Sequence, residues 1–262
     1  MNLCNTIADV RSELRSRRGV SLGLVPTMGA LHAGHLSLLA AARSENETVV
    51  MSLFVNPTQF GDVADLARYP RDTEHDLALA EKAGVDVVFA PSEGEMYPPG
   101  FQTWVDVVEL GSTLEGESRP GHFRGVATVV LKLLEIVRPT RVYFGQKDAQ
   151  QSAVVRRMIS DLALEVELRV LPTVRDSDGL ALSSRNVLLS PKEREQALAL
   201  PRALGTGDRD DALALLRSTP GLEVDYVEVA DFEPRVLAGA VRVGSTRLID
   251  NVPLEASEGE AA

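Results

Sequence analysis

Two of the four histidines of this 262-residue chain stand three positions apart, in the segment His32-Ala33-Gly34-His35. The apolar run at residues 20–25 predicts a strand before this segment, and the apolar spacing after it predicts a helix. A helix N-terminus offers backbone N–H groups and a partial positive charge, which favour a phosphate. Imidazole N–H groups can also stabilise the charge that develops when phosphorus is attacked. The segment therefore predicts a phosphate-binding site, although two ordinary surface histidines could have the same spacing.

A second polar segment, Gly145-Gln146-Lys147-Asp148, also lies between a predicted strand and a predicted helix. Lys147 can pair with a phosphate as a compact positive charge. Asp148 can cap the following helix or hold Mg²⁺ through water. The sequence leaves open whether this segment binds phosphate or whether Lys147 is only exposed and Asp148 only a cap.

A third segment, Leu182-Ser183-Ser184-Arg185, places two hydroxyl groups beside a guanidinium group. Arginine is always charged and donates its hydrogen bonds in a fork, so this combination suits a triphosphate. Serine-rich turns beside a helix start are also common without any ligand. The segment by itself does not decide between these two interpretations.

Uncharged amide side chains leave the end of another predicted strand together. Asn56 and Gln59 can each donate and accept hydrogen bonds, so they could bind the hydroxyls and the carboxylate of a small polar substrate. The alternative is that both side chains only stabilise a turn by bonding to backbone groups. Arg119, His122 and Arg124 precede a predicted helix and could bind a carboxylate or a phosphate, or they could be solvated.

The elements that must position these segments alternate between helices and strands. Helices are predicted at 7–18, 34–45, 73–83, 125–137 and 149–161, and strands at 20–25, 48–55, 85–90, 141–144 and 164–170. This alternation predicts βαβ units and a parallel sheet. The chain contains no Gly-x-x-x-x-Gly-Lys-Ser/Thr segment, and no Gly-x-Gly-x-x-Gly follows the first strand, which excludes a P-loop and the dinucleotide fingerprint.

The pattern changes after about Val174. Helices are predicted at 191–204 and 210–218, and short strands at 224–229, 240–243 and 247–249. We therefore predict an α/β fold with a catalytic parallel-sheet domain at 1–174, a small α+β C-terminal domain at 175–254 and a disordered acidic tail at 255–262.

Composition limits the partners and the compartment. The net charge of −11 argues against a nucleic-acid partner. The single cysteine, Cys4, excludes an internal disulfide and a cysteine-cluster metal site. No apolar run approaches the roughly 20 residues that a membrane helix needs. The N-terminus has no basic region followed by an apolar one, so we expect a cytoplasmic protein without a membrane partner.

Six motifs in order resemble those of the pantothenate synthetase (pantoate–β-alanine ligase) family. They are Pro-Thr-Met-Gly-x-Leu-His-x-Gly-His (26–35), Phe-Val-Asn-Pro-x-Gln-Phe (54–60), Tyr-Pro-Arg (69–71), Ser-Arg-Pro-Gly-His-Phe-x-Gly-Val (118–126), Gly-x-Lys-Asp-x-x-Gln (145–151) and Leu-Ser-Ser-Arg-Asn (182–186). The resemblance covers some two thirds of the chain. It implies a Rossmann-like sheet of the nucleotidyltransferase type, followed by a small lid domain.

The resemblance also implies a reaction in two steps. The carboxylate of (R)-pantoate attacks the α-phosphorus of ATP with Mg²⁺, which gives pantoyl adenylate and pyrophosphate. The amine of β-alanine then attacks the acyl carbon, which gives pantothenate and AMP. Mg²⁺ would be held mainly by the phosphates of ATP rather than by protein ligands, and the family is usually homodimeric.

Carried over by position, the resemblance assigns His32, His35, Lys147 and Arg185 to catalysis, with His35 as charge stabiliser or proton donor. Gln59, Gln151 and Asn56 would bind pantoate and β-alanine. ATP would be bound by Met28, Gly29, Ala30, Leu31, His32, Ala33, Gly34, His35, Gly145, Gln146, Lys147, Asp148, Val174, Leu182, Ser183, Ser184 and Arg185.

The chain departs from the family pattern in three places. Gln146 stands where many members have Glu, and His75 stands where some members have an acid, so we predict no metal ligand at His75. The region 204–222 is shorter than usual, so we expect a trimmed lid. A nucleotidyltransferase that keeps the nucleotide in its product is the nearest rival, and a catalytically inactive nucleotide sensor is a second.

Overall fold

The computed structural model describes residues 1–17 and 19–254. Contacts divide the chain into two compact units, the first formed by Met1–Gly145 with Gln150–Leu171 and the second by Gln146–Ala149 with the residues from Pro172 onward. The domain boundary expected after residue 174 stays a prediction, and the tail expected at 255–262 lies outside the described residues. Within the described ranges, no helix is long and apolar enough to cross a membrane.

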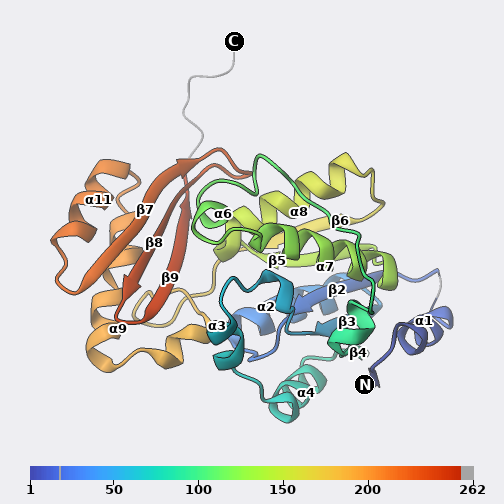
Figure 1. Ribbon diagram of the computed structural model, residues 1–262. Helices are drawn as coiled ribbons and strands as arrows, with labels where there is room; N and C mark the ends of the chain where they lie inside the picture. The colour runs from blue at the N-terminus through green and yellow to red at the C-terminus, as the bar shows by residue number, and fades with distance from the viewer. Residues whose placement is uncertain (18, 255–262) are drawn as a thin grey trace. The chain divides into compact units, whose positions relative to one another are not determined.

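The first unit is built on a six-stranded parallel sheet in the order β1-β4-β3-β2-β5-β6 (Figure 1). Its strands are β1 (Asn2–Cys4), β2 (Leu22–Thr27), β3 (Thr48–Leu53), β4 (Val87–Phe89), β5 (Arg141–Gly145) and β6 (Glu167–Leu171). The chain runs outward from β2 to β3 and β4, and then returns to place β5 on the other side of β2. The carboxyl ends of β2 and β5 therefore lie beside each other at the point where the strand order reverses, which is where such sheets bind ligands.

Helices cover both faces of this sheet. The helices of the first unit are α1 (Ile7–Arg15), α2 (Ala33–Glu45), α3 (Val63–Arg68), α4 (Thr73–Lys82), α5 (Glu93–Met96), α6 (Glu115–Ser118), α7 (His122–Val137) and α8 (Ala149–Asp161). The core on one face joins α1, α7 and α8 to Val50 of β3, whereas the core on the other face joins α2 to Val49 and Met51. This alternation follows from the period of two along a strand, so both faces of the sheet are apolar.

The second unit contains a three-stranded antiparallel sheet of β7 (Leu222–Ala230), β8 (Val236–Val243) and β9 (Thr246–Pro253). Helices α9 (Pro191–Ala197), α10 (Ala199–Leu204) and α11 (Arg209–Ser218) share a core with this sheet, which includes Leu200, Leu216 and Leu237. The α/β parallel-sheet fold with a small α+β C-terminal part is thereby confirmed.

The observed elements differ from the predicted ones in several places. The single helix predicted at 191–204 is wrong: it divides at Leu198, and Pro201 has no N–H to donate to the carbonyl one turn before it. The first predicted strand is shifted, because β2 pairs with β3 as far as Thr27 opposite Leu53, which places Pro26 in the strand rather than in the loop. The short edge strand β1 was not predicted.

Candidate active site

The loop between β2 and α2 is held by a buried carboxylate. Gly29 and Ala30 have left-handed backbone conformations, with φ of 84° and 51°. Asp76, in the first turn of α4, is 2% exposed and accepts hydrogen bonds from the N–H groups of Ala30 (2.9 Å) and Leu31 (2.8 Å). A Cβ atom on Gly29 would lie 2.7 Å from the Asp76 carboxylate, so this approach requires glycine. The path of the loop is therefore set by a residue of another helix.

The two histidines of this loop form a reciprocal cap at the N-terminus of α2. His32 Nδ1 accepts a hydrogen bond from the Gly34 N–H (3.1 Å), and the His32 N–H donates to His35 Nδ1 (3.3 Å). The two rings lie 4.2 Å apart between centroids. A ring nitrogen that accepts a hydrogen bond carries no proton, so each neutral imidazole carries its proton on Nε2. Both side chains therefore present an Nε2–H donor.

Asn56 and Gln59 are joined to each other and to the loop before α2. Asn56 caps the short 3₁₀ helix η1 (Pro57–Gln59), which follows β3, and Gln59 is the last residue of that helix. Asn56 Nδ2 donates to Gln59 Oε1 (3.1 Å). Gln59 Nε2 lies 3.1 Å from Met28 Sδ. The predicted substrate residues and the predicted nucleotide loop are thus in direct contact within the first unit.

Asn56 is held by a tyrosine that the sequence did not single out. The Tyr97 hydroxyl donates to Asn56 Oδ1 (2.9 Å), which also accepts from the Thr58 hydroxyl (2.9 Å). Burial raises the pKa of Tyr97 above its ordinary value, so the phenol stays protonated and remains a donor at neutral pH. Asn56 thereby has its carbonyl oxygen turned towards protein donors.

The residues before and within the first turn of α7 bind the backbone of Gln59. His122 is 8% exposed, and its Nδ1 lies 2.8 Å from the Gln59 carbonyl oxygen. Arg119 Nη2 donates to the same oxygen (3.3 Å). Of the three roles left open by the sequence, solvation is excluded for His122, because its ring is buried against the protein backbone.

In the second unit, a buried asparagine binds the segment that follows β5. This segment is the 3₁₀ helix η2 (Gln146–Asp148), and Asn251 Nδ2 donates to the carbonyl oxygens of Gln146 and Lys147 (both 2.9 Å). Gln146 Nε2 donates in return to Asn251 Oδ1 (3.1 Å). Lys147 Nζ lies 3.8 Å from Asp148 Oδ1. Asn251 belongs to β9 and had no distinguishing signal in the sequence.

The other predicted nucleotide residues of the second unit lie next to an isolated antiparallel β-bridge between Arg175 and Ala181. The Leu182 N–H donates to the Val174 carbonyl oxygen (3.0 Å), so these two predicted positions are neighbours. Ser183 caps the 3₁₀ helix η3 (Ser184–Leu188), and its hydroxyl accepts from the Arg185 N–H (3.2 Å). Close by, Arg175 pairs with the buried Asp250 of β9 at 2.6 Å and 3.0 Å.

The predicted site residues divide between the two units. The first unit holds Met28, Gly29, Ala30, Leu31, His32, Ala33, Gly34, His35, Asn56, Gln59, Gly145 and Gln151, and the second holds Gln146, Lys147, Asp148, Val174, Leu182, Ser183, Ser184 and Arg185. Gly145 ends β5, and Gln151 lies in the first turn of α8. Within the part of the chain that the structure describes, no cluster of three or more His, Cys, Asp or Glu side chains could hold a metal ion.

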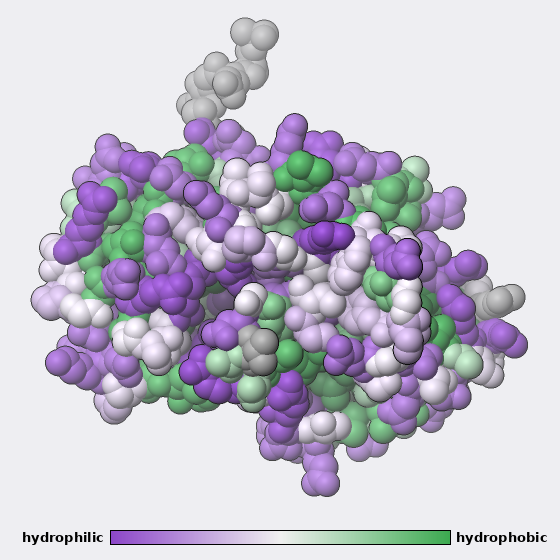
Figure 2. All heavy atoms as spheres, viewed as in Figure 1, coloured by the Kyte–Doolittle hydropathy of each residue, from purple (hydrophilic) through white to green (hydrophobic). Residues whose placement is uncertain are grey.

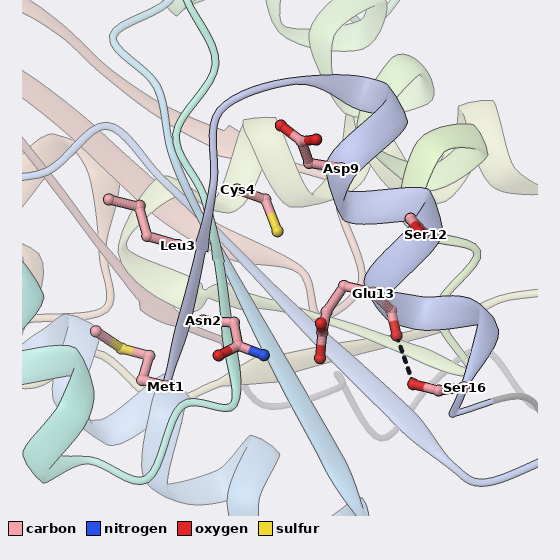
Figure 3. Close-up of a pocket in the computed structure, with 8 residues that line it drawn as sticks. All are labelled: Met1, Asn2, Leu3, Cys4, Asp9, Ser12, Glu13 and Ser16. Carbon is pink, nitrogen blue, oxygen red and sulfur yellow. Dashed lines mark hydrogen bonds between the residues drawn. The ribbon is translucent and has the colours of Figure 1, made fainter.

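An open groove between β1 and α1 contains none of these residues (Figure 3). It has a volume of about 460 Å³, and Asn2 and Cys4 line it from the strand, whereas Asp9 and Glu13 line it from the helix. Burial, followed by Glu13 and Asp9, raises the pKa of the Cys4 thiol. The raised pKa disfavours the thiolate, which is the reactive form of cysteine.

A model of the pantoate-β-alanine ligase family matches residues 2–253 of the chain. This chain belongs to the pantoate-β-alanine ligase family. The pantothenate synthetase of Roseiflexus sp. (strain RS-1) is 54% identical, with 98% of this chain and 100% of the relative covered. That alignment extends over 279 positions, more than the 262 residues of this ligase, so the relative contains residues without a counterpart here. The trimmed lid expected at 204–222 stays a prediction.

Solved structures of the same ligase family have the same fold. The pantothenate synthetase of Thermus thermophilus superposes with a TM-score of 0.91 at 47% identity and covers 97% of this chain and 99% of its own. The pantoate-β-alanine ligase of Francisella tularensis, complexed with beta-gamma ATP and β-alanine, has a TM-score of 0.89 at 38% identity and covers 97% of both chains. The similarity to the ligase family therefore extends over nearly the whole chain, beyond the six motifs that predicted it.

Proposed function

We propose that this protein condenses pantoate with β-alanine to form pantothenate at the expense of ATP, through a pantoyl adenylate. The observation that carries the proposal is the reciprocal cap of His32 and His35 at the end of β2, beside the point where the strand order reverses. Family membership supplies the identity of the two substrates that are joined.

In the first step, a carboxylate oxygen of pantoate attacks the α-phosphorus, and the bond from the α-phosphorus to the bridging oxygen breaks. Pyrophosphate leaves with the bonding electron pair. The Nε2–H groups of His32 and His35 donate hydrogen bonds to phosphate oxygens, and the α2 N-terminus adds its partial positive charge. Because both imidazoles are neutral donors, we propose that His35 stabilises charge rather than transferring a proton.

In the second step, the amine nitrogen of β-alanine attacks the acyl carbon of the adenylate. The carbon–oxygen bond to the phosphate breaks, AMP leaves with the electron pair, and the amine loses its proton to solvent. Gln59, Gln151 and Asn56 are proposed to bind pantoate, with Gln59 and Asn56 also close to β-alanine. An enzyme that holds the adenylate and β-alanine in one site makes their reaction effectively unimolecular. A closed site also keeps water from hydrolysing the adenylate.

Residues of the second unit are proposed to bind the nucleotide itself. Lys147 and Arg185 carry positive charge for the phosphates, and Ser183 and Ser184 add hydroxyl donors. Val174 would contact adenine through its backbone. This assignment rests on family membership and on the order of the motifs.

Mg²⁺ is proposed to enter as part of the MgATP substrate. The Asp76 carboxylate, which is buried beside the nucleotide loop, accepts hydrogen bonds from backbone N–H groups with both oxygens, so we assign it to holding the loop. The metal is proposed to be held mainly by phosphate oxygens and water. We also propose that the enzyme is a cytoplasmic homodimer, which light scattering of the purified protein tests.

The reaction is tested by mixing the enzyme with pantoate, β-alanine and MgATP, and measuring AMP, pyrophosphate and the amide. We expect all three in equal amounts. With pantoate but without β-alanine, we expect exchange of labelled pyrophosphate into ATP, because the adenylate forms reversibly. A stable product that retains the nucleotide, or ATP binding without turnover, would refute the proposal.

A further inference from the structure

The motif before and within the first turn of α7 has no role in the proposed chemistry, yet it contacts the proposed pantoate ligand Gln59. Two side chains bind the Gln59 carbonyl oxygen: His122 through Nδ1 at 2.8 Å and Arg119 through Nη2 at 3.3 Å. The second ring nitrogen of His122 lies 3.3 Å from Arg119 Nη1. The three residues thus form a closed triangle of polar contacts.

The partners of the His122 ring determine its proton position. A carbonyl oxygen can only accept, so Nδ1 must carry the proton that is donated to Gln59. A guanidinium group can only donate, so Nε2 must be the acceptor. His122 is therefore a neutral imidazole in a single tautomer, and Arg119 orients its ring. Arg119 is oriented in turn by the buried Glu115, whose carboxylate lies 3.9 Å away.

The backbone of α7 confines the same short segment from another side. A Cβ atom on Gly125 would lie 2.5 Å from the Thr58 carbonyl oxygen and 2.8 Å from the Gln59 nitrogen. The Gly125 carbonyl oxygen accepts a hydrogen bond from Asn56 Nδ2 (3.2 Å). Both Asn56 and Gln59 are thus fixed against the start of one helix.

We infer that Arg119 and His122 are positioning residues that fix Gln59 for pantoate. The inference rests on the proposed role of Gln59 as a pantoate ligand. A hydrogen bond to the Gln59 carbonyl sets the direction of its Cα–Cβ bond, and therefore the place of the amide that binds substrate. A misplacement of about 1 Å at a reacting site can cost roughly 100-fold in rate. Because both side chains act on the backbone of Gln59, we expect the loss of either contact to raise the KM for pantoate.

Two isosteric variants separate hydrogen bonding from simple filling of space. In His122→Asn, the amide nitrogen takes the place of Nδ1 and can still donate to the Gln59 carbonyl oxygen. In His122→Gln, the amide reaches the place of Nε2, and the donor to Gln59 is lost. We expect His122→Asn to have a pantoate KM close to that of the wild type, and His122→Gln to raise it by about 10- to 100-fold. The KM for ATP should stay unchanged in both.

Arg119→Lys provides a second route to the same answer if His122→Gln fails to fold, as judged by its urea unfolding curve. Lysine keeps the charge but lacks the planar fork whose two nitrogens contact the carbonyl oxygen and the ring separately, so the pantoate KM should again rise alone. The exposed His75 gives a matched control, because His75→Gln makes the same chemical change away from the site. It should leave both KM values unchanged.

Gln59→Leu distinguishes failure of this inference from failure of the proposed site. If Gln59→Leu raises the pantoate KM but His122→Gln and Arg119→Lys do not, the positioning role is wrong and the proposed site stands. If Gln59→Leu leaves the pantoate KM unchanged, the proposed pantoate ligand is wrong, and the inference falls with it. The positioning role would also be overturned if the KM for ATP rose as much as the KM for pantoate. It would be overturned as well if His122→Asn raised the pantoate KM as much as His122→Gln.

Discussion

Asp76→Asn should weaken ATP binding without replacing any proposed ATP ligand. The wild-type carboxylate accepts from the N–H groups of Ala30 and Leu31, with one oxygen for each. Asparagine keeps one acceptor oxygen, but its NH₂ group faces the other N–H donor. The loop that carries His32 then has an unsatisfied N–H group in its present conformation, and other conformations become more populated.

The size of the effect follows from the number of donors that lose their acceptor. A buried donor without a partner costs about 1–3 kcal/mol. One such donor in Asp76→Asn shifts the loop equilibrium by roughly 5- to 150-fold. The observed affinity for ATP is the intrinsic affinity multiplied by the fraction of molecules in which the loop has the conformation that binds ATP. We therefore expect the KM for ATP to rise, by up to roughly 150-fold, and Asp76→Ala, which removes both acceptors, to have a larger effect.

The assay is AMP release at varied ATP with saturating pantoate and β-alanine, supported by the urea unfolding midpoint. Asp72→Asn is the matched control, because Asp72 caps the same helix α4 from an exposed position, and Asn and Asp are equally good N-caps. An Asp76→Asn enzyme with the wild-type KM for ATP would refute the reasoning. So would an Asp72→Asn enzyme with the same defect.

Three further changes test other parts of the structure. His35→Ala should lower kcat by about 10²–10³-fold, because one donor to the developing phosphate charge is lost. Wild-type turnover would contradict this prediction, and His75→Ala is the control. Asn251→Ala should raise the KM for ATP but not for pantoate, since Lys147 loses the bond to its carbonyl; an increase for pantoate alone would exclude that role. Burial raises the pKa of Tyr143 from 10.0 to about 12, so the folded state keeps the phenol proton and the free energy of unfolding should fall as pH rises between these values. Urea unfolding of Tyr143→Phe should lack this fall, and an identical pH dependence would show that another group causes it.

Hydrophilic side chains cover much of the face shown in Figure 2, with smaller hydrophobic areas between them. Surface composition of this kind carries little information about the site, because most globular proteins share it. The useful signals in the sequence were local. Apolar spacing predicted α2 and α8 almost to the residue, and it placed the His-Ala-Gly-His segment at the start of a helix.

Prediction was weaker where a local pattern competed with a distant contact. One error had a local cause instead: the missing N–H of Pro201 divides the helix expected at 191–204. Arg119 and His122 could not be assigned from spacing, since charged and aromatic side chains before a helix have many uses. Their partner, the Gln59 carbonyl oxygen, is a backbone atom and leaves no mark in the sequence.

By itself, the sequence determined the alternation of strands and helices, the order of the motifs and therefore the family. These depend on residues within a few positions of one another, and a helix or strand has a fixed period. Only the tertiary structure decided what holds the site: Asp76 lies 46 positions from Ala30, His122 lies 63 from Gln59, and Asn251 lies 105 from Gln146. A hydrogen-bonding side chain can serve many partners, and only packing of the chain selects one.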